Sequence, residues 1–100
     1  MKSDFDWDDG NRAKCTKHGV SVAKIETLFA SGPRVAPDIA HSVSEDRLIA
    51  VGRTSEGRPL FVAFTLRRRG DRSLIRPISA CYMHKKEADA YEKSSKAQDR

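Results

Sequence analysis

Residues 48–80 contain three short apolar stretches separated by two turn-forming segments, and few folds can accommodate this pattern. The apolar stretches are Leu48–Gly52, Leu60–Leu66 and Leu74–Ala80, each of a length typical of a β-strand. The intervening sequences, Thr-Ser-Glu-Gly and Arg-Arg-Gly-Asp, are rich in residues that favour tight turns. This spacing predicts an antiparallel meander of three strands.

The residues within the stretches indicate where each strand lies in the sheet. Leu60–Leu66 is apolar on both faces, which is typical of a central strand. Pro77 has no N–H to donate, so its strand is expected at an edge of the sheet or with a bulge at the proline. Another short strand is expected at Arg34–Ala36, and Phe5–Trp7 alternates apolar and polar residues as a strand does.

Two helices are predicted before the meander. Asp8 is expected to cap a polar helix that ends near His18, where Gly19 stops it. Ser21 is expected to cap a second helix that ends at Gly32-Pro33. The apolar residues of this second helix repeat at helical spacing and are expected to face the core: Val22, Ile25, Leu28 and Phe29.

A C-terminal helix is predicted over His84–Lys96, where acidic residues precede basic ones by four positions. Together these elements predict an α+β domain, with two N-terminal helices and a C-terminal helix on one face of a small antiparallel sheet. A chain of 100 residues fits a single domain over residues 1–100. Its ordered core is expected at about residues 5–92, with a frayed C-terminal tail.

Positive charge is concentrated in the meander. The formal net charge of the chain is +5, and the segment from Arg47 to Arg76 holds eight arginines, no lysine and only two acids, Glu56 and Asp71. The planar guanidinium group of arginine suits phosphate. The segment therefore indicates an anionic partner, either nucleic acid or an acidic protein, with a merely solvated charged surface as the alternative.

Other features argue against several classes of protein. The two cysteines, Cys15 and Cys81, do not make a disulfide framework. His18, His41 and His84 are scattered, so we expect no metal site and no cofactor. No apolar run is long enough to span a bilayer, and the N-terminus lacks the apolar stretch of a signal peptide. We therefore expect a cytoplasmic protein without a membrane partner.

Two-residue alternation places an arginine on one face of each strand of the meander. These arginines are Arg53, Arg67 and Arg76. If the three faces coincide, their guanidinium groups converge on one phosphate. If they do not, each arginine lies at a strand end and reaches water, and the sequence leaves both arrangements open.

Several short motifs occur in an order that resembles the BrnT toxin family. The motifs are Phe5-x-Trp7-Asp8, Lys17-His18-Gly19-Val20-Ser21, Glu45-Asp46-Arg47, Gly52-Arg53, Gly57-Arg58-Pro59-Leu60, Phe64-Thr65 and Ile78-Ser79-Ala80. They cover roughly residues 5–91. The Trp-Asp and Lys-His-Gly-Val-Ser opening, followed by Ile-Ser-Ala after the meander, is the most specific part of the resemblance.

The resemblance implies a fold related to the RelE-type ribonuclease toxins. It implies the toxin of a type II toxin–antitoxin system, a metal-independent endoribonuclease that cleaves RNA and arrests bacterial growth. It also implies a BrnA-like antitoxin with a ribbon-helix-helix part, through which alone the pair binds operator DNA. A non-catalytic module that binds nucleic acid or protein on the same scaffold is the alternative. The family usually has an arginine where this chain has Cys81, so either Arg76 compensates or activity is weakened.

Cleavage of RNA without a metal needs cations that stabilise charge on the phosphate, and a base and an acid that move protons. The candidate catalytic residues are Arg53, Arg67 and Arg76 for the charge and His18 for proton transfer. The structural alternative for His18, which we prefer, is that a cation at a helix C-terminus is favoured by the helix dipole. The candidate RNA-binding residues are five cations and one aromatic that can stack on a base: Lys17, Arg47, Arg58, Lys85, Lys86 and Tyr82.

Overall fold

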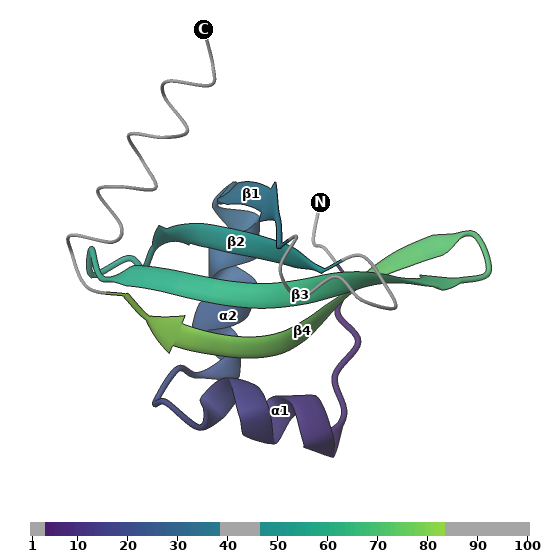
Figure 1. Cartoon of the computed structure of the whole chain (residues 1–100), viewed down its shortest axis with the longest axis horizontal. Helices are drawn as coiled ribbons and strands as arrows, with labels where there is room; N and C mark the ends of the chain where they lie inside the picture. Colours follow the sequence, from purple (N-terminus) through teal and green to yellow (C-terminus); the bar gives the residue numbers. More distant parts are fainter. Residues whose placement is uncertain (1–3, 39–46, 84–100) are drawn as a thin grey trace, which may run out of the picture.

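The computed structural model describes residues 4–38 and 47–83, which form a four-stranded antiparallel sheet and two helices (Figure 1). The elements are α1 (Asp9–Thr16), α2 (Val22–Ala30), β1 (Arg34–Pro37), β2 (Leu48–Arg53), β3 (Pro59–Arg69) and β4 (Arg72–Tyr82). The strands lie in the order β1-β2-β3-β4. The predicted α+β class and the antiparallel meander are confirmed, whereas the helix expected over His84–Lys96 lies outside the described residues.

The order of the strands explains the composition of the meander. β3 lies between β2 and β4, as its apolar residues on both faces predicted. β4 is at an edge of this sheet and also carries a bulge, because Ala63 pairs with Ser79 while the next residue, Phe64, pairs with Pro77. Ile78 is the extra residue of the bulge. Both arrangements expected for a proline in a strand therefore occur together.

The β3–β4 hairpin is longer than the apolar pattern predicted. The expected turn at Arg68–Asp71 is wrong at its start, because β3 continues to Arg69 and pairs there with Arg72. The turn is confined to Gly70-Asp71, with Gly70 at a φ of 63° that favours glycine. Pairing between the strands thus overrides the local turn preference. Figure 1 shows this hairpin projecting beyond the rest of the sheet.

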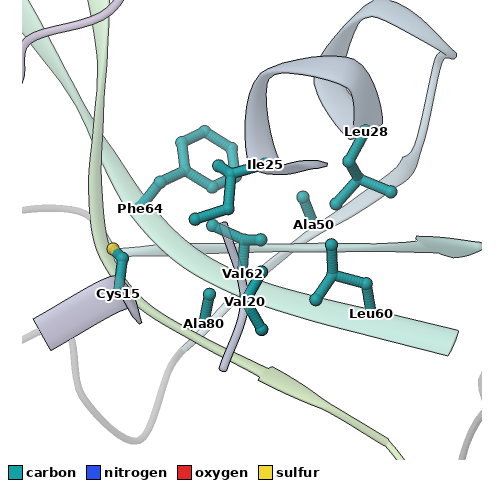
Figure 2. Packing of buried hydrophobic residues seen from close by; sticks show 9 residues of the cluster. All are labelled: Cys15, Val20, Ile25, Leu28, Ala50, Leu60, Val62, Phe64 and Ala80. Atoms are coloured by element: carbon teal, nitrogen blue, oxygen red, sulfur yellow. The ribbon is translucent and has the colours of Figure 1, made fainter. Parts of the chain in front are cut away.

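Both helices pack on one face of the sheet. Alternation along β3 turns Leu60, Val62 and Phe64 toward the helices, where they meet Ile25 and Leu28 of α2. The full core cluster is Cys15, Val20, Ile25, Leu28, Ala50, Leu60, Val62, Phe64 and Ala80 (Figure 2). Of the four residues expected to face the core, Ile25 and Leu28 are buried, and Val22 and Phe29 are half-buried. Within the described residues, no helix is long and apolar enough to cross a membrane.

The caps predicted for both helices are present. The side chain of Ser21 accepts a hydrogen bond from Lys24 N at 3.2 Å at the start of α2. Asp8 caps α1 through a reciprocal pair of hydrogen bonds with Asn11, at 2.9 and 2.7 Å. Asn11 is buried, and its side-chain amide also donates to the carbonyl of Pro77 in β4 at 2.9 Å. The polar helix α1 is therefore attached to the sheet by a buried hydrogen bond as well as by Cys15.

The N-terminal segment runs along the outer edge of β4. Phe5 forms a parallel bridge with Ile75, through hydrogen bonds from Asp6 N to Ile75 O (2.8 Å) and from Ile75 N to Asp4 O (2.9 Å). The strand expected over Phe5–Trp7 is thus reduced to a single bridge. It nevertheless brings acidic residues of the N-terminus against the arginine-rich hairpin.

Candidate active site

The register of the sheet separates the three arginines whose convergence the sequence left open. Arg53 pairs with Pro59 at one end of β3, whereas Arg67 lies eight residues further along that strand. At about 3.3 Å per residue the two positions are roughly 26 Å apart, too far for a shared phosphate. Arg76 pairs with Thr65, so Arg67 and Arg76 are diagonal neighbours on one face. The three arginines therefore do not converge on one phosphate, and only Arg67 and Arg76 are neighbours in the sheet.

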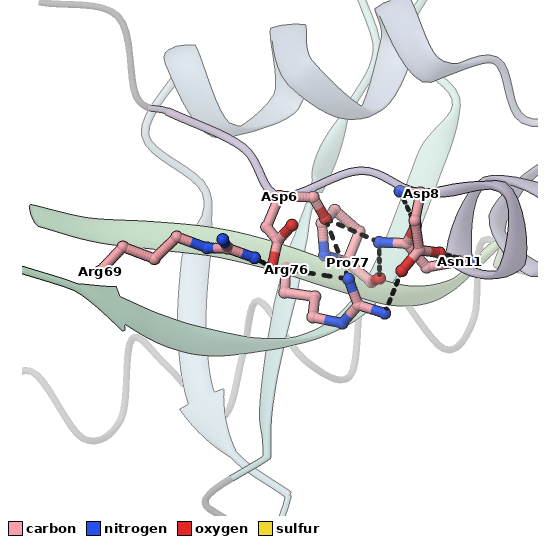
Figure 3. Close-up of polar contacts among 6 residues, drawn as sticks. All are labelled: Asp6, Asp8, Asn11, Arg69, Arg76 and Pro77. Atoms are coloured by element: carbon pink, nitrogen blue, oxygen red, sulfur yellow. Dashed lines mark hydrogen bonds and ion pairs between the residues drawn. The ribbon is translucent and has the colours of Figure 1, made fainter.

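Arg76 is paired with carboxylates of the N-terminal segment (Figure 3). Its Nη2 lies 2.7 Å from Asp8 Oδ2, and its Nη1 lies 3.6 Å from Asp6 Oδ2. The backbone N–H of Asn11 and the Arg76 guanidinium lower the pKa of the Asp8 carboxyl. The same hydrogen bond to Asp8 raises the pKa of Arg76. A phosphate that binds Arg76 must therefore compete with Asp8.

Two other arginines of the hairpin meet the same segment. Arg72 pairs with Asp4, and Arg69 Nη2 lies 3.7 Å from Asp6 Oδ2. These contacts are exposed at the arginine side, so each contributes little to stability on its own. Together they offset part of the positive charge that makes the meander distinctive in the sequence. Arg69 and Arg72, next to the turn of the hairpin, thus form ion pairs with carboxylates of the N-terminal segment.

A second polar cluster lies at the opposite end of the sheet, where β4 ends and β2 turns into β3. The Arg58 guanidinium carbon lies 3.6 Å from the centre of the Tyr82 ring. Lys24 Nζ donates a hydrogen bond to Tyr82 Oη at 3.2 Å and lies 3.4 Å from Glu56 Oε1. These hydrogen bonds raise the pKa of Lys24, with the one to Tyr82 having the larger effect. The cluster therefore combines a carboxylate, a phenol and two cations.

Three elements position this cluster. Tyr82 is the last residue of β4 and pairs with Leu60 in β3. The β2–β3 turn is held by a hydrogen bond from Thr54 N to Arg58 O at 2.9 Å, and it carries both Glu56 and Arg58, two residues apart in the chain. Lys24 lies in the first turn of α2, where a positive charge is disfavoured by the helix dipole. Its contacts with Glu56 and Tyr82 offset that cost.

A cavity of about 270 Å³ adjoins the cluster, between α2 and the β2–β3 turn. Lys24, Arg53 and Glu56 contribute polar groups to its lining, and Ala23 and Leu28 contribute apolar ones. Arg53 Nη1 also donates to the carbonyl of Gly57 at 3.2 Å. Arg53, Arg58 and Tyr82, three residues that the sequence singled out separately, thus lie around one end of the sheet.

The other predicted site residues are placed less centrally. Lys17 and His18 are exposed in the connection between α1 and α2, with Lys17 as the C-cap of α1. Figure 1 shows this connection at the same end of the sheet as the β2–β3 turn. Arg47 precedes β2, and its Nε lies 3.5 Å from Asp38 Oδ2. Lys85 and Lys86 lie outside the described residues.

Sequence reasoning missed Lys24 and Glu56. One signal for Lys24 was present, since a lysine in the first turn of a helix opposes the helix dipole and therefore needs another reason to be there. Glu56 carried no such signal, because acids are common in turns. Cys81 pairs with Phe61 on the face of the sheet away from the helices, next to the strand end that carries Arg53.

Among residues 4–38 and 47–83, no group of three or more His, Cys, Asp or Glu side chains is arranged to hold a metal ion. No curated protein matches the chain. A family model described as the ribonuclease toxin BrnT of type II toxin–antitoxin systems matches residues 7–87. That range contains both helices and all four strands of the described sheet, and the cluster around Tyr82 as well. The chain therefore belongs to the BrnT family of ribonuclease toxins.

Proposed function

We propose that this protein is the toxin of a type II toxin–antitoxin pair and arrests growth as a metal-independent endoribonuclease. The observation that carries the proposal is the family match over residues 7–87, which includes every described cation of the candidate site. The structure adds a cavity bordered by Arg53, Lys24 and Glu56 and adjoined by Tyr82, a set of groups suited to phosphate chemistry. The RelE-type fold and a cytoplasmic location belong to the same proposal.

The chemistry of such cleavage uses the ribose 2′-hydroxyl as the nucleophile at the adjacent phosphorus. Negative charge grows on the phosphate oxygens, and fixed cations aimed at that charge supply much of the rate. Arg53 and Arg58 are the proposed cations at the reacting phosphate. Arg67 and Arg76, further along the sheet, are proposed to contact phosphates beyond it.

The remaining candidates extend the proposed RNA contact around the same end of the sheet. Lys17 and His18 are exposed there, and Lys85 and Lys86 follow Tyr82 closely in the sequence. Arg47, which immediately precedes β2, is proposed to bind the RNA near the β3–β4 hairpin. Contacts of this kind neutralise phosphates and make RNA binding weaken as salt rises.

The proposed partner is a BrnA-like antitoxin with a ribbon-helix-helix part, through which the pair reaches operator DNA. An antitoxin that covers the cluster around Tyr82 blocks access of RNA directly. An acidic antitoxin segment suits the cations there, and attraction of this kind speeds association and falls with salt.

A second candidate function is a non-catalytic module that binds nucleic acid or protein. The observation that favours it is Cys81, which stands where the family usually has an arginine and lies on the same face and at the same sheet end as Arg53. The missing cation would leave binding through the other arginines in place and weaken catalysis.

Inducible expression in a bacterium, with and without the neighbouring gene, tests the proposal. We expect growth to stop and cellular RNA to be cut when the protein is made alone, and growth to resume when the neighbouring gene is co-expressed. A variant with both Arg53 and Arg58 replaced by alanine serves as the inactive control. Normal growth with intact RNA, at protein levels matched by immunoblot, would favour the non-catalytic module.

A further inference from the structure

We infer that Glu56, Lys24 and Tyr82 form the proton-transfer centre of this ribonuclease, with Glu56 as the base, Tyr82 as the acid and Lys24 between them. The inference rests on the proposed function, because it assigns the atoms that carry out the proposed RNA cleavage. It adds two residues, Lys24 and Glu56, that belong to none of the motifs on which the family resemblance rests.

The geometry around Lys24 Nζ carries the inference. This ammonium group lies 3.2 Å from the phenol oxygen of Tyr82 and 3.4 Å from a carboxylate oxygen of Glu56, so it stands between an acid and a base. Lysine can only donate hydrogen bonds, so the Tyr82 oxygen accepts and keeps its own O–H proton for another acceptor. A phosphate placed at Lys24 would have a proton acceptor and a proton donor close to it.

Arg58 completes the environment of the phenol. Its guanidinium lies 3.6 Å from the ring centre, whereas Lys24 Nζ is 5.7 Å from that centre and donates a hydrogen bond to the hydroxyl oxygen. Arg58 therefore covers the face of the ring, and Lys24 approaches its polar end. Both cations stabilise the phenolate that remains when Tyr82 gives up its proton.

The adjoining cavity indicates how the substrate lies. Its volume of about 270 Å³ is just below the usual 300–1,000 Å³ of small-molecule sites, so it suits a group the size of one nucleobase. Glu56 and Lys24 line this cavity. The nucleotide whose base enters it would bring its 2′-hydroxyl to Glu56, with the leaving 5′-oxygen toward Tyr82.

Glu56 and Tyr82 account for both proton transfers of the cleavage reaction. The Glu56 carboxylate takes the proton of the 2′-hydroxyl as the 2′-oxygen bonds to phosphorus, and the added negative charge develops beside Lys24. The bond from phosphorus to the 5′-oxygen breaks, and that oxygen takes the Tyr82 proton. The products are a 2′,3′-cyclic phosphate and a 5′-hydroxyl end, and the proton on Glu56 returns to the Tyr82 phenolate through water.

The same contacts would also arise if the cluster only fastened α2 to the β2–β3 turn, so the test must separate the two roles. We would compare the parent with Tyr82→Phe on two oligoribonucleotides. One has the normal 5′-oxygen at the cleavage site, and in the other a sulfur atom replaces that bridging oxygen. A thiolate leaves without a proton, because a thiol is far more acidic than an alcohol.

We expect Tyr82→Phe to slow cleavage of the normal substrate by about 10²-fold or more, the usual size of a general-acid contribution. On the sulfur substrate the variant should cleave within a few-fold of the parent. Equal losses on both substrates, or no loss on the normal one, would overturn the role of Tyr82 as the acid. Circular dichroism of the variant checks that the fold is intact.

Glu56→Gln gives a second, independent readout. Loss of the base should slow both substrates, because the 2′-hydroxyl must be deprotonated in each. Glu26→Gln is the matched control, since Glu26 lies on α2 with its carboxylate 3.0 Å from Trp7 Nε1, outside the cluster. Glu56→Gln cleaving as fast as Glu26→Gln would overturn the assignment of the base. A parent that cleaves neither substrate would instead remove the proposed function itself.

Discussion

The guanidinium of Arg76 in β4 lies 2.7 Å from the carboxylate of Asp8, which is also the N-cap of α1. One aspartate thus satisfies backbone donors of the helix and pairs with a cation of the sheet. The sequence pattern alone suggested Arg76 as a phosphate ligand. In the structure Arg76 is already paired with Asp8. The cluster around Tyr82 is therefore the better candidate for the site that binds the reacting phosphate.

The Asp8 pair predicts how stability depends on pH. The pKa of this carboxyl is lowered in the folded protein, so its contribution is present above the unfolded pKa of about 3.9 and is lost as pH falls through the folded value. Asp8→Asn keeps a capping oxygen and removes the titration. We therefore expect the free energy of unfolding, measured with urea, to fall more for the parent than for the variant between about pH 5 and about pH 2. Superimposable profiles would contradict the pairing.

The separation of the arginines predicts unequal effects on cleavage. Arg53→Ala should lower the cleavage rate by about 10²-fold, as removal of one group that stabilises transition-state charge does. Arg67→Ala and Arg76→Ala should weaken cleavage less, chiefly through binding, because they lie far along the sheet from the cavity. Steady-state kinetics of the three variants on one RNA make the comparison. A larger kcat effect for Arg67 or Arg76 than for Arg53 would place the site at the hairpin end.

Cys81 offers a gain-of-function test. It precedes Tyr82 and pairs with Phe61 on the face away from the helices, so an introduced arginine adds a cation at the same end of the sheet as the proposed site, on the opposite face. Cys81→Arg should therefore bind RNA more tightly, with the slope of log K against log salt steeper by roughly 0.7 for one added contact to a single strand. Cys81→Ser is the matched control without charge. Identical salt slopes for the two variants would show that this strand end does not face RNA.

Asn11 provides a prediction about the scaffold rather than the site. It is buried, and its amide donates to the carbonyls of Asp6 and Pro77, both at 2.9 Å. Asn11→Ala leaves these acceptors without that donor and should lower the free energy of unfolding by roughly 1–3 kcal/mol. Arg12→Ala, at an exposed position of the same helix, is the control. Denaturant unfolding that finds the two variants equally stable would contradict the account of how α1 is held.

Local signals predicted much of the fold. The caps Asp8 and Ser21, and the edge position and bulge at Pro77, each depend on residues close in sequence, and the structure confirms them. The contacts that define the site are of another kind. Lys24 and Tyr82 are 58 residues apart, and Asp8 and Arg76 are 68 apart, so each pair depends on strand register and helix placement that no local pattern fixes.

The length of the β3–β4 hairpin also depends on strand pairing that the local sequence does not determine. Arg68 and Arg69 favour a turn when read beside Gly70-Asp71, yet they extend β3 because their partners in β4 satisfy the backbone hydrogen bonds. The sequence could not decide whether Arg53 meets Arg67 and Arg76, because alternation fixes the face of a residue and not its distance along the strand.

Cleavage of a single-stranded RNA by the purified protein in excess EDTA tests the central claim most directly. The proposed chemistry needs only the 2′-hydroxyl and groups of the chain, so we expect cleavage to persist and the downstream product to carry a 5′-hydroxyl that polynucleotide kinase labels without prior dephosphorylation. The Arg53→Ala, Arg58→Ala double variant excludes a contaminating nuclease. Activity that disappears in EDTA and returns with magnesium or zinc, or products with a 5′-phosphate, would contradict the mechanism.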